Sequence, residues 1–129
     1  MPEVSQVEST SSQRPVKTLE DLFERIRIYY PQADLSIIQK AYEFSERAHE
    51  GQIRRSGEPY ISHPLSVAGI LADYRLDLDS IATGLLHDTV EDTHATLEDI
   101  KREFGPTIAN LVDGVTKISQ IKFKNSVEK

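Results

Sequence analysis

The stretch HDTVEDT, residues 87–93, places one histidine and three carboxylates within six positions. If it is helical, Asp88 and Asp92 stand at i and i+4, where like charges cost roughly 0.2–0.5 kcal/mol. A bound dication would reverse this penalty, and imidazole and carboxylate ligands suit Mn, Fe, Zn or Mg. The stretch therefore predicts a metal site. The alternative is a solvated acidic helix end with a histidine in the core.

The apolar spacing of residues 79–93 predicts one helix with an acidic face and a core face. Gly84 falls in the polar arc one turn before His87, and its missing side chain predicts space for a ligand. The acidic face carries His87, Asp88, Glu91 and Asp92, and the core face carries Ala82, Leu85, Leu86, Thr89 and Val90.

Two further stretches carry residues suited to this chemistry. In ISHP, His63 stands where a helix is expected to begin, so it can project from a loop, although an N-cap or core role is the simpler interpretation. The loop IRRSGEPY contains Arg54, Arg55 and Ser56 in an otherwise acidic chain. Arginine forks match phosphate oxygens, whereas ordinary surface charge is the alternative. Metal ligands and phosphate-type donors together indicate metal-assisted hydrolysis of a phosphate ester.

Length and composition set the class of protein. The 129 residues suit one domain, and 38% hydrophobic with 28% charged residues is typical of a globular chain. A net charge of −6 argues against direct nucleic-acid binding. No cysteine is present, so any metal must sit on His, Asp or Glu. No apolar run approaches the roughly 20 residues of a membrane span, so we expect no membrane association and a cytoplasmic location.

Helical periodicity recurs along the chain, and no stretch alternates like a strand, so the predicted class is all-α. Thr18 and Thr96 are predicted N-caps, Gly51 a left-handed helix end, and Pro64 a first helical residue. Residues 1–17 are expected to be a disordered tail and 18–129 the domain, whose polar end suggests a longer parent chain. The expected helices cover residues 18–30, 34–51, 64–74, 79–93, 96–104 and 107–121.

Three motifs in order, GQIRRSGEPYISHP, GLLHDTVEDT and FGPTIANLVDGVTKIS, strongly resemble the hydrolase domain of the RelA/SpoT-homologue family. The resemblance covers roughly residues 18–129. It implies the helical bundle of an HD-type phosphohydrolase, named for its His-Asp pair. It also implies a (p)ppGpp 3′-pyrophosphohydrolase of the stringent response, which removes pyrophosphate from guanosine tetraphosphate or pentaphosphate and leaves GDP or GTP.

Carried over by position, the resemblance implies that His63, His87 and Asp88 bind a manganese ion, Mn2+. It implies that Glu91 orients or deprotonates the attacking water and that Asp92 helps to hold this water.

The same resemblance implies that Arg54, Arg55 and Ser56 contact the nucleotide and its diphosphates. Arg55 stands where the family commonly has lysine, which keeps the charge but changes the geometry.

The family also supplies a further aspartate ligand from a later motif like LADRLHN, which this chain does not contain. We therefore expect residues 18–129 to be the N-terminal part of an HD hydrolase domain, without the synthetase region and the downstream helices of the parent chain. Two alternatives remain open. One is an inactive or partner-dependent module, and the other is an HD phosphohydrolase acting on another nucleotide.

Overall fold

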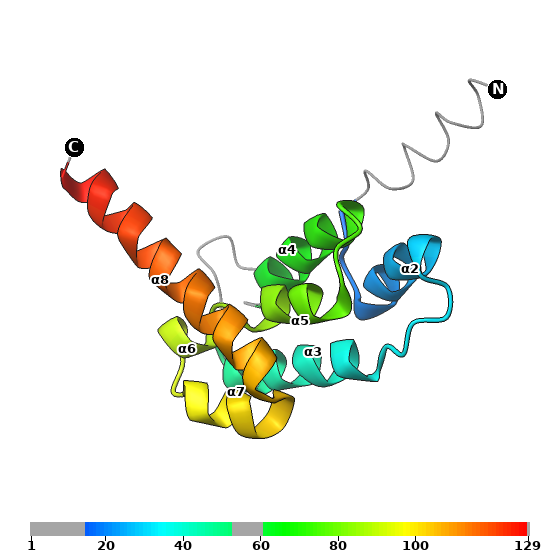
Figure 1. Cartoon of the computed structure of the whole chain (residues 1–129), viewed down its shortest axis with the longest axis horizontal. Helices are drawn as coiled ribbons and strands as arrows, with labels where there is room; N and C mark the ends of the chain where they lie inside the picture. The colour runs from blue at the N-terminus through cyan, green and yellow to red at the C-terminus, as the bar shows by residue number, and fades with distance from the viewer. Residues whose placement is uncertain (1–14, 53–60, 129) are drawn as a thin grey trace.

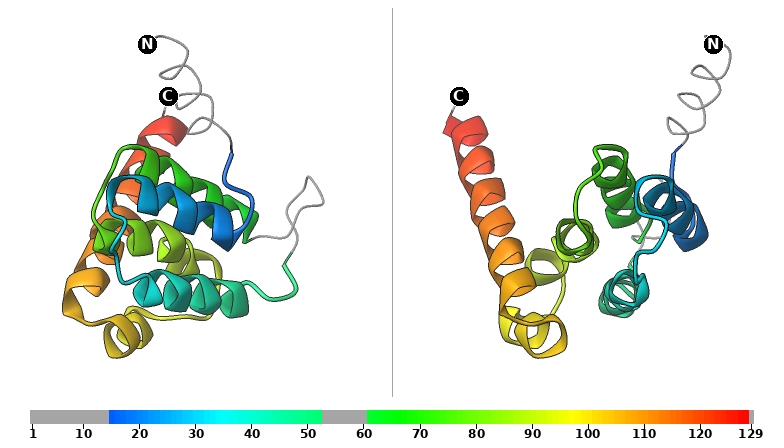
Figure 2. Two further views of the ribbon diagram at one scale, coloured as in Figure 1. Left: turned by 90° about the vertical axis from the view of Figure 1, so that its right-hand side faces the viewer. Right: turned by 45° about the vertical axis from the view of Figure 1, so that its right-hand side comes forward.

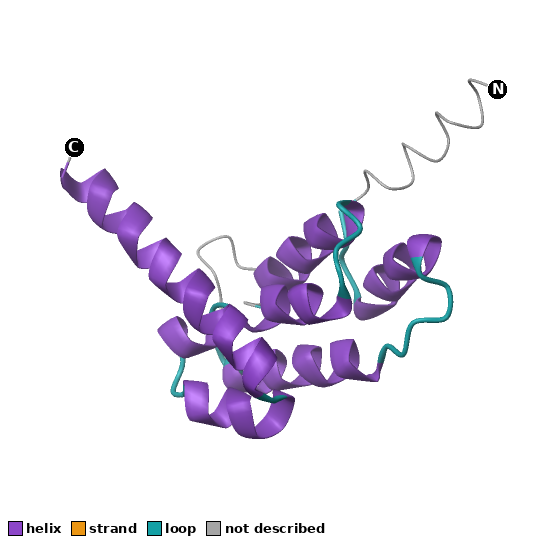
Figure 3. Ribbon diagram, in the orientation of Figure 1, coloured by secondary structure: helices purple, strands orange, loops and turns teal. Residues whose placement is uncertain are grey.

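The computed structural model describes residues 15–52 and 61–128, and these form helices joined by short loops (Figure 3). No strand occurs in this part of the chain, so the predicted all-α class is confirmed. In chain order the helices are α2 (Leu19–Tyr29), α3 (Ser36–Ala48), α4 (Ser62–Asp73), α5 (Leu78–Leu86), α6 (Thr89–Asp92), α7 (Leu97–Phe104) and α8 (Pro106–Glu128).

Helix α5 lies at the centre of the bundle (Figure 1). It packs against α4, α3 and α8, while α2 packs on α4 and α7 packs on α8. Every residue from 81 to 86 is buried, so α5 has no solvent-facing side in its second half. The C-terminal half of α8 extends away from the other helices (Figures 1 and 2).

Local capping chemistry sets several helix starts. The Thr18 hydroxyl accepts the Asp21 N–H at 3.1 Å, and the Asp21 carboxylate accepts the Thr18 N–H at 3.2 Å. Thr96 and Asp99 form the same reciprocal pair at the start of α7. Both predicted caps are therefore confirmed. Asp77 caps α5 by accepting the Ser80 N–H at 3.3 Å, a cap that the sequence analysis did not identify.

The expected helix over 79–93 is wrong as a single element. Helix α5 ends at Leu86 and α6 begins at Thr89, with His87 and Asp88 between them. Thr89 is fully buried, and its hydroxyl donates to the Leu86 carbonyl at 2.8 Å. This bond satisfies one of the carbonyls left open at the end of α5, so the break costs little.

Three other boundaries also differ. Pro64 is the third residue of α4, so His63 lies in the first helical turn instead of in a loop. Helix α8 continues to Glu128, well past the expected end at residue 121. Gly51 has the predicted positive φ, 84°, although α3 itself ends at Ala48. The predicted tail falls largely on residues 1–14, outside the described residues.

The segment before α2 packs against α4 through a glycine. Val16 is buried, and a Cβ added at Gly69 would lie 2.6 Å from its Cγ2 and 2.8 Å from its Cβ. Because the valine Cβ is attached directly to the backbone, rotation of the side chain cannot relieve this overlap. The segment and α4 would have to separate.

We predict that Gly69→Ala lowers the free energy of unfolding by about 1–3 kcal/mol through overpacking. Gly114→Ala is the matched control, because a Cβ at Gly114 meets nothing within 4 Å in the described structure. It should raise stability by about 0.5–1 kcal/mol, since alanine is the better helix former. Urea denaturation of both variants measures this, and equal effects would contradict the packing of Val16 on α4.

Candidate metal centre

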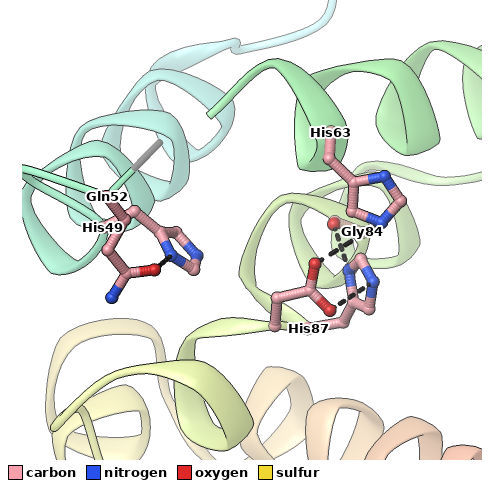
Figure 4. Close-up of polar contacts among 6 residues, drawn as sticks. His49, Gln52, His63, Gly84 and His87 are labelled. Carbon is pink, nitrogen blue, oxygen red and sulfur yellow. Dashed lines mark hydrogen bonds and ion pairs between the residues drawn. The ribbon is translucent and has the colours of Figure 1, made fainter. Parts of the chain in front are cut away.

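His63, His87 and Asp88 converge from two helical segments. Their candidate ligand atoms all lie within 4.8 Å of one another. His63 Nε2 is 3.5 Å from Asp88 Oδ2, and His87 Nε2 is 2.9 Å from Asp88 Oδ1. The two imidazole centroids are 5.9 Å apart, and Figure 4 shows these rings directed toward one another. All three residues are partly buried.

A backbone carbonyl fixes the orientation of the His87 ring. Its Nδ1 lies 2.7 Å from the Gly84 carbonyl oxygen, one turn earlier in α5 (Figure 4). A carbonyl only accepts hydrogen bonds, so Nδ1 carries the proton and Nε2 faces Asp88. A backbone carbonyl in this role is the usual partner of a metal-binding histidine, because it selects the tautomer and aims the ligating nitrogen.

His87 and Asp88 shift each other's pKa values. Burial alone would lower the pKa of His87, but the hydrogen bond and charge of Asp88, with smaller contributions from Gly84 and Glu91, raise it above its usual value. Burial alone would raise the pKa of Asp88, but the hydrogen bond and charge of His87 lower it, and the charges of two other histidines add to this. For each of these two residues, the hydrogen bond and charge of the other outweigh the effect of burial.

The predicted place of Gly84 on a polar arc is wrong, although Gly84 and His87 do line a common cavity. A Cβ at Gly84 would lie 2.7 Å from Leu71 Cδ1 and 3.6 Å from the Ala68 Cα. Atoms of α4 thus occupy the space that a side chain at Gly84 would need, because α4 approaches α5 closely at this point. Sequence periodicity placed Gly84 on the polar arc, whereas the structure buries it.

The remaining predicted site residues fall into two groups. Glu91 and Asp92 lie in α6, one turn after the metal-type cluster, and both are exposed. Burial, followed by the negative charges of Asp92 and Asp88, raises the pKa of Glu91. The predicted substrate-binding residues, Arg54, Arg55 and Ser56, lie outside the described residues.

Two residues near the site, His49 and Gln52, were not predicted from the sequence. His49, at the end of α3, is buried, and its Nδ1 lies 3.4 Å from Gln52 Oε1. Gln52 Nε2 donates to the Asp92 carbonyl at 3.2 Å. No local pattern could have revealed this contact, because Gln52 and Asp92 are 40 residues apart in sequence.

An apolar cavity of about 370 Å³ lies beside His87, between α4, α5 and α8. Leu71 and Val67 of α4 line it opposite Leu111 and Val115 of α8. Ile118 continues the α8 face one turn further and is 60% exposed. The bundle thus presents an apolar groove next to the polar cluster.

The donor set fits a divalent cation. Two imidazole nitrogens and one carboxylate oxygen suit Mn, Fe or Zn better than a harder ion such as Ca²⁺. Three protein ligands leave positions open, as catalytic sites require. The aspartate and the fixed His87 tautomer supply the charge and lone pair that such an ion needs.

Comparison with known proteins gives the family. The family model described as HD domain matches residues 41–129, so the chain belongs to the HD-domain family. A solved structure of a metazoan ortholog of SpoT, described as hydrolysing ppGpp and playing a role in starvation responses, superposes with a TM-score of 0.59 at 33% identity. The match covers 63% of this chain and 48% of that chain.

The resemblance to the RelA/SpoT-homologue family is confirmed by curated relatives. The chain is 57% identical over 99 residues to a GTP pyrophosphokinase of Myxococcus xanthus, a match covering 77% of this chain and 13% of the relative. It is 45% identical to the bifunctional (p)ppGpp synthase/hydrolase SpoT of Escherichia coli K12, covering 84% of this chain and 16% of the relative.

A third relative is the guanosine-3′,5′-bis(diphosphate) 3′-pyrophosphohydrolase of Aquifex aeolicus, which is 50% identical and matches 84% of this chain and 15% of its own length. The chain therefore spans only 13% to 16% of the length of these three relatives. Among the described residues, none of the helices has both the length and the apolar character needed to cross a bilayer.

We predict that His63→Ala weakens Mn²⁺ binding at least about tenfold. Loss of a residue that only hydrogen-bonds to a metal ligand already lowers metal affinity about 10–100-fold. His94→Ala is the matched control, because His94 is exposed and lies outside the cluster. Its affinity should equal that of the parent. Titration calorimetry of both variants measures the difference, and equal affinities would place the ion elsewhere.

Proposed function

We propose that this chain provides the catalytic core of a manganese-dependent 3′-pyrophosphohydrolase acting on guanosine tetraphosphate and pentaphosphate. The observation that carries the proposal is the convergence of His63, His87 and Asp88 within 4.8 Å. Two carboxylates follow on the next turn, Glu91 and Asp92. Relatives at 45% and 50% identity bear names for this hydrolysis, which supports the choice of substrate.

His63, His87 and Asp88 would hold the manganese ion. A cation at this position supplies positive charge that acidifies water and offsets charge on phosphoryl oxygens. The surrounding protein keeps these ligands in position. The Gly84 carbonyl keeps the His87 tautomer that leaves Nε2 available, and the α4–α5 packing keeps His63 opposite.

Glu91 is the proposed general base. Its raised pKa, caused by burial and by the charges of Asp92 and Asp88, makes it a better proton acceptor than an ordinary carboxylate. Asp92 is proposed to hold the water. The water oxygen attacks the phosphorus next to the ribose 3′ oxygen, and its proton passes to Glu91. The bond from that phosphorus to the 3′ oxygen breaks, and the 3′ oxygen takes up a proton from solvent. Pyrophosphate leaves, and GDP or GTP remains.

Arg54, Arg55 and Ser56 are proposed to bind the nucleotide and its diphosphates. Their side chains suit this role chemically, because guanidinium groups form two parallel hydrogen bonds to phosphate oxygens and stack on bases. In a chain with a net charge of −6, two adjacent arginines form a local exception that would attract an anionic ligand.

The names of the relatives include synthetases as well as hydrolases, so they do not decide the activity. The site favours hydrolysis, because its metal-type ligands are followed one turn later by carboxylates that can act as a base. We further propose that residues 18–129 form the N-terminal part of an HD hydrolase domain, completed by helices of a parent chain. We propose that it acts in the cytoplasm without binding nucleic acid directly.

A second candidate function is a non-catalytic module that docks on a partner. The apolar groove between α4 and α8 favours it, because an exposed apolar face of this kind is a usual docking surface. A chain that is monomeric by size-exclusion chromatography and unfolds cooperatively by circular dichroism counts against dependence on a partner.

Hydrolysis is tested with guanosine tetraphosphate and Mn²⁺, following the release of pyrophosphate and GDP. We predict that Glu91→Gln lowers kcat at least about 100-fold, the usual contribution of a general base, while Mn²⁺ affinity stays unchanged. Glu98→Gln, in the first turn of α7 and exposed, is the control and should retain activity. The proposal would be rejected by absence of metal-dependent release from the unsubstituted domain when it includes the downstream helices, or by full activity of Glu91→Gln in that domain.

Substrate identity is tested with Arg54→Ala. We predict that KM for guanosine tetraphosphate rises at least about tenfold, because a charged hydrogen bond to phosphate is worth about 1.5–3 kcal/mol. Lys101→Ala, an exposed cation of α7, is the control. If alarmone turnover is the same in both variants, an HD phosphohydrolase acting on another nucleotide becomes the better interpretation.

A further inference from the structure

Helix α6, which carries the proposed general base, is short and is anchored unevenly along its length. It has only four residues, and its N-cap residue, Asp88, makes no side-chain capping bond. Its first residue, Thr89, is fully buried, whereas Glu91 and Asp92 at its end are exposed. The backbone becomes extended at Thr93, with φ −136° and ψ −174°. The Thr93 hydroxyl donates to the Thr89 carbonyl at 2.6 Å, so the position of Glu91 depends on this local bond and on contacts that reach the far end of the turn from elsewhere.

A hydrogen bond from another part of the chain reaches that end. Gln52 Nε2 donates to the Asp92 carbonyl at 3.2 Å. Gln52 directly follows the turn that closes α3, so this bond ties the end of α3 to the end of α6. In Figure 4, His49 and Gln52 lie together on one side of the site, and His63 and His87 lie on the other.

The direction of the Gln52 amide is determined by its two neighbours. The Asp92 carbonyl can only accept, so the amide NH₂ must face it. The amide oxygen then faces His49 Nδ1 at 3.4 Å, which selects the Nδ1–H tautomer of His49. His49 is 3% exposed, and its backbone N–H donates to the Ser45 carbonyl at 3.0 Å. The buried imidazole thus favours the amide orientation that serves α6.

We propose that Gln52 is a positioning residue for catalysis, and that His49 acts through it by fixing its amide. The pair sets the place of the α6 turn, and with it the place of the Glu91 carboxylate relative to His63, His87 and Asp88. This inference rests on the proposed hydrolase function. Because the metal-type ligands are held by α4 and α5, loss of the pair should affect the chemical step and spare metal binding.

The test uses Gln52→Met, which keeps the side-chain length and removes both polar groups. We expect kcat to fall about tenfold or more, with KM and the Mn²⁺ dissociation constant within twofold of the parent, because small misplacements of a catalytic group are costly. Gln39→Met is the matched control, since Gln39 lies in α3 and its exposed amide donates to Glu43 at 3.2 Å, on the surface of the helix. It should leave all three constants unchanged.

Amide hydrogen exchange supplies a readout independent of activity. The Asp92 N–H donates to the Asp88 carbonyl at 2.9 Å, and the Thr93 N–H donates to the Thr89 carbonyl at 3.0 Å. In Gln52→Met these two amides should exchange about five- to tenfold faster, as the loss of one net hydrogen bond predicts. The amides of α5 should keep their protection.

His49→Leu tests whether His49 acts through Gln52. It should lower kcat in the parent and have little further effect in the Gln52→Met background, because a residue that acts through another is not additive with it. Independent, additive losses would reject this order.

The outcomes separate the two proposals. If the unsubstituted domain, with its downstream helices, releases no pyrophosphate, the hydrolase proposal fails, while the exchange rates still decide whether the pair holds α6. Unchanged kcat and unchanged exchange in Gln52→Met reject the positioning role. A parallel fall of kcat, Mn²⁺ affinity and melting temperature also rejects it, because the pair would then support the whole fold.

Discussion

The close approach of α4 to α5 is the constraint on which the site depends. It occurs where Leu71 covers Gly84, and a Cβ there would lie 2.7 Å from the leucine side chain. Because the helices are this close, His63 in the first turn of α4 comes within 3.5 Å of Asp88 just past the end of α5. Neither residue is brought to the site by its own loop. Both are positioned by the packing of two helices whose contact surface is buried and apolar.

The break between α5 and α6 follows from competing demands on one segment. The residues before it are buried on all sides, whereas Glu91 and Asp92 after it are exposed. A continuous helix would hold Asp88 and Asp92 on one face as a like-charged pair. In the structure Asp88 turns toward His87 instead, where the histidine lowers its pKa. The buried Thr89 then restarts the helix. The Asp92 N–H donates to the Asp88 carbonyl at 2.9 Å, so the two residues remain one turn apart, while the Asp88 carboxylate faces the two histidines.

How much the sequence could predict depends on how local each cause is. The caps at Thr18 and Thr96 need only a residue three places on, and both were predicted correctly. The break at His87 was missed, because apolar periodicity continues across it and the responsible contact is the Thr89 hydroxyl. Gly84 was misread since its neighbour, Leu71, comes from another helix. These errors share one origin, which is that helical periodicity describes a face but not what covers it.

The candidate site therefore has two supports of different strength. His87 and Asp88 follow directly from α5, whose residues 81–86 are all buried in the centre of the bundle. Glu91 and Asp92 stand on a four-residue turn whose far end meets Gln52 from α3. Thr89 and Val90 hold the start of α6 in the core, so local opening reaches first the exposed half that carries Glu91 and Asp92. Binding of a cation and positioning of the base are thus governed by separate contacts, and the same fold can retain the first while losing the second.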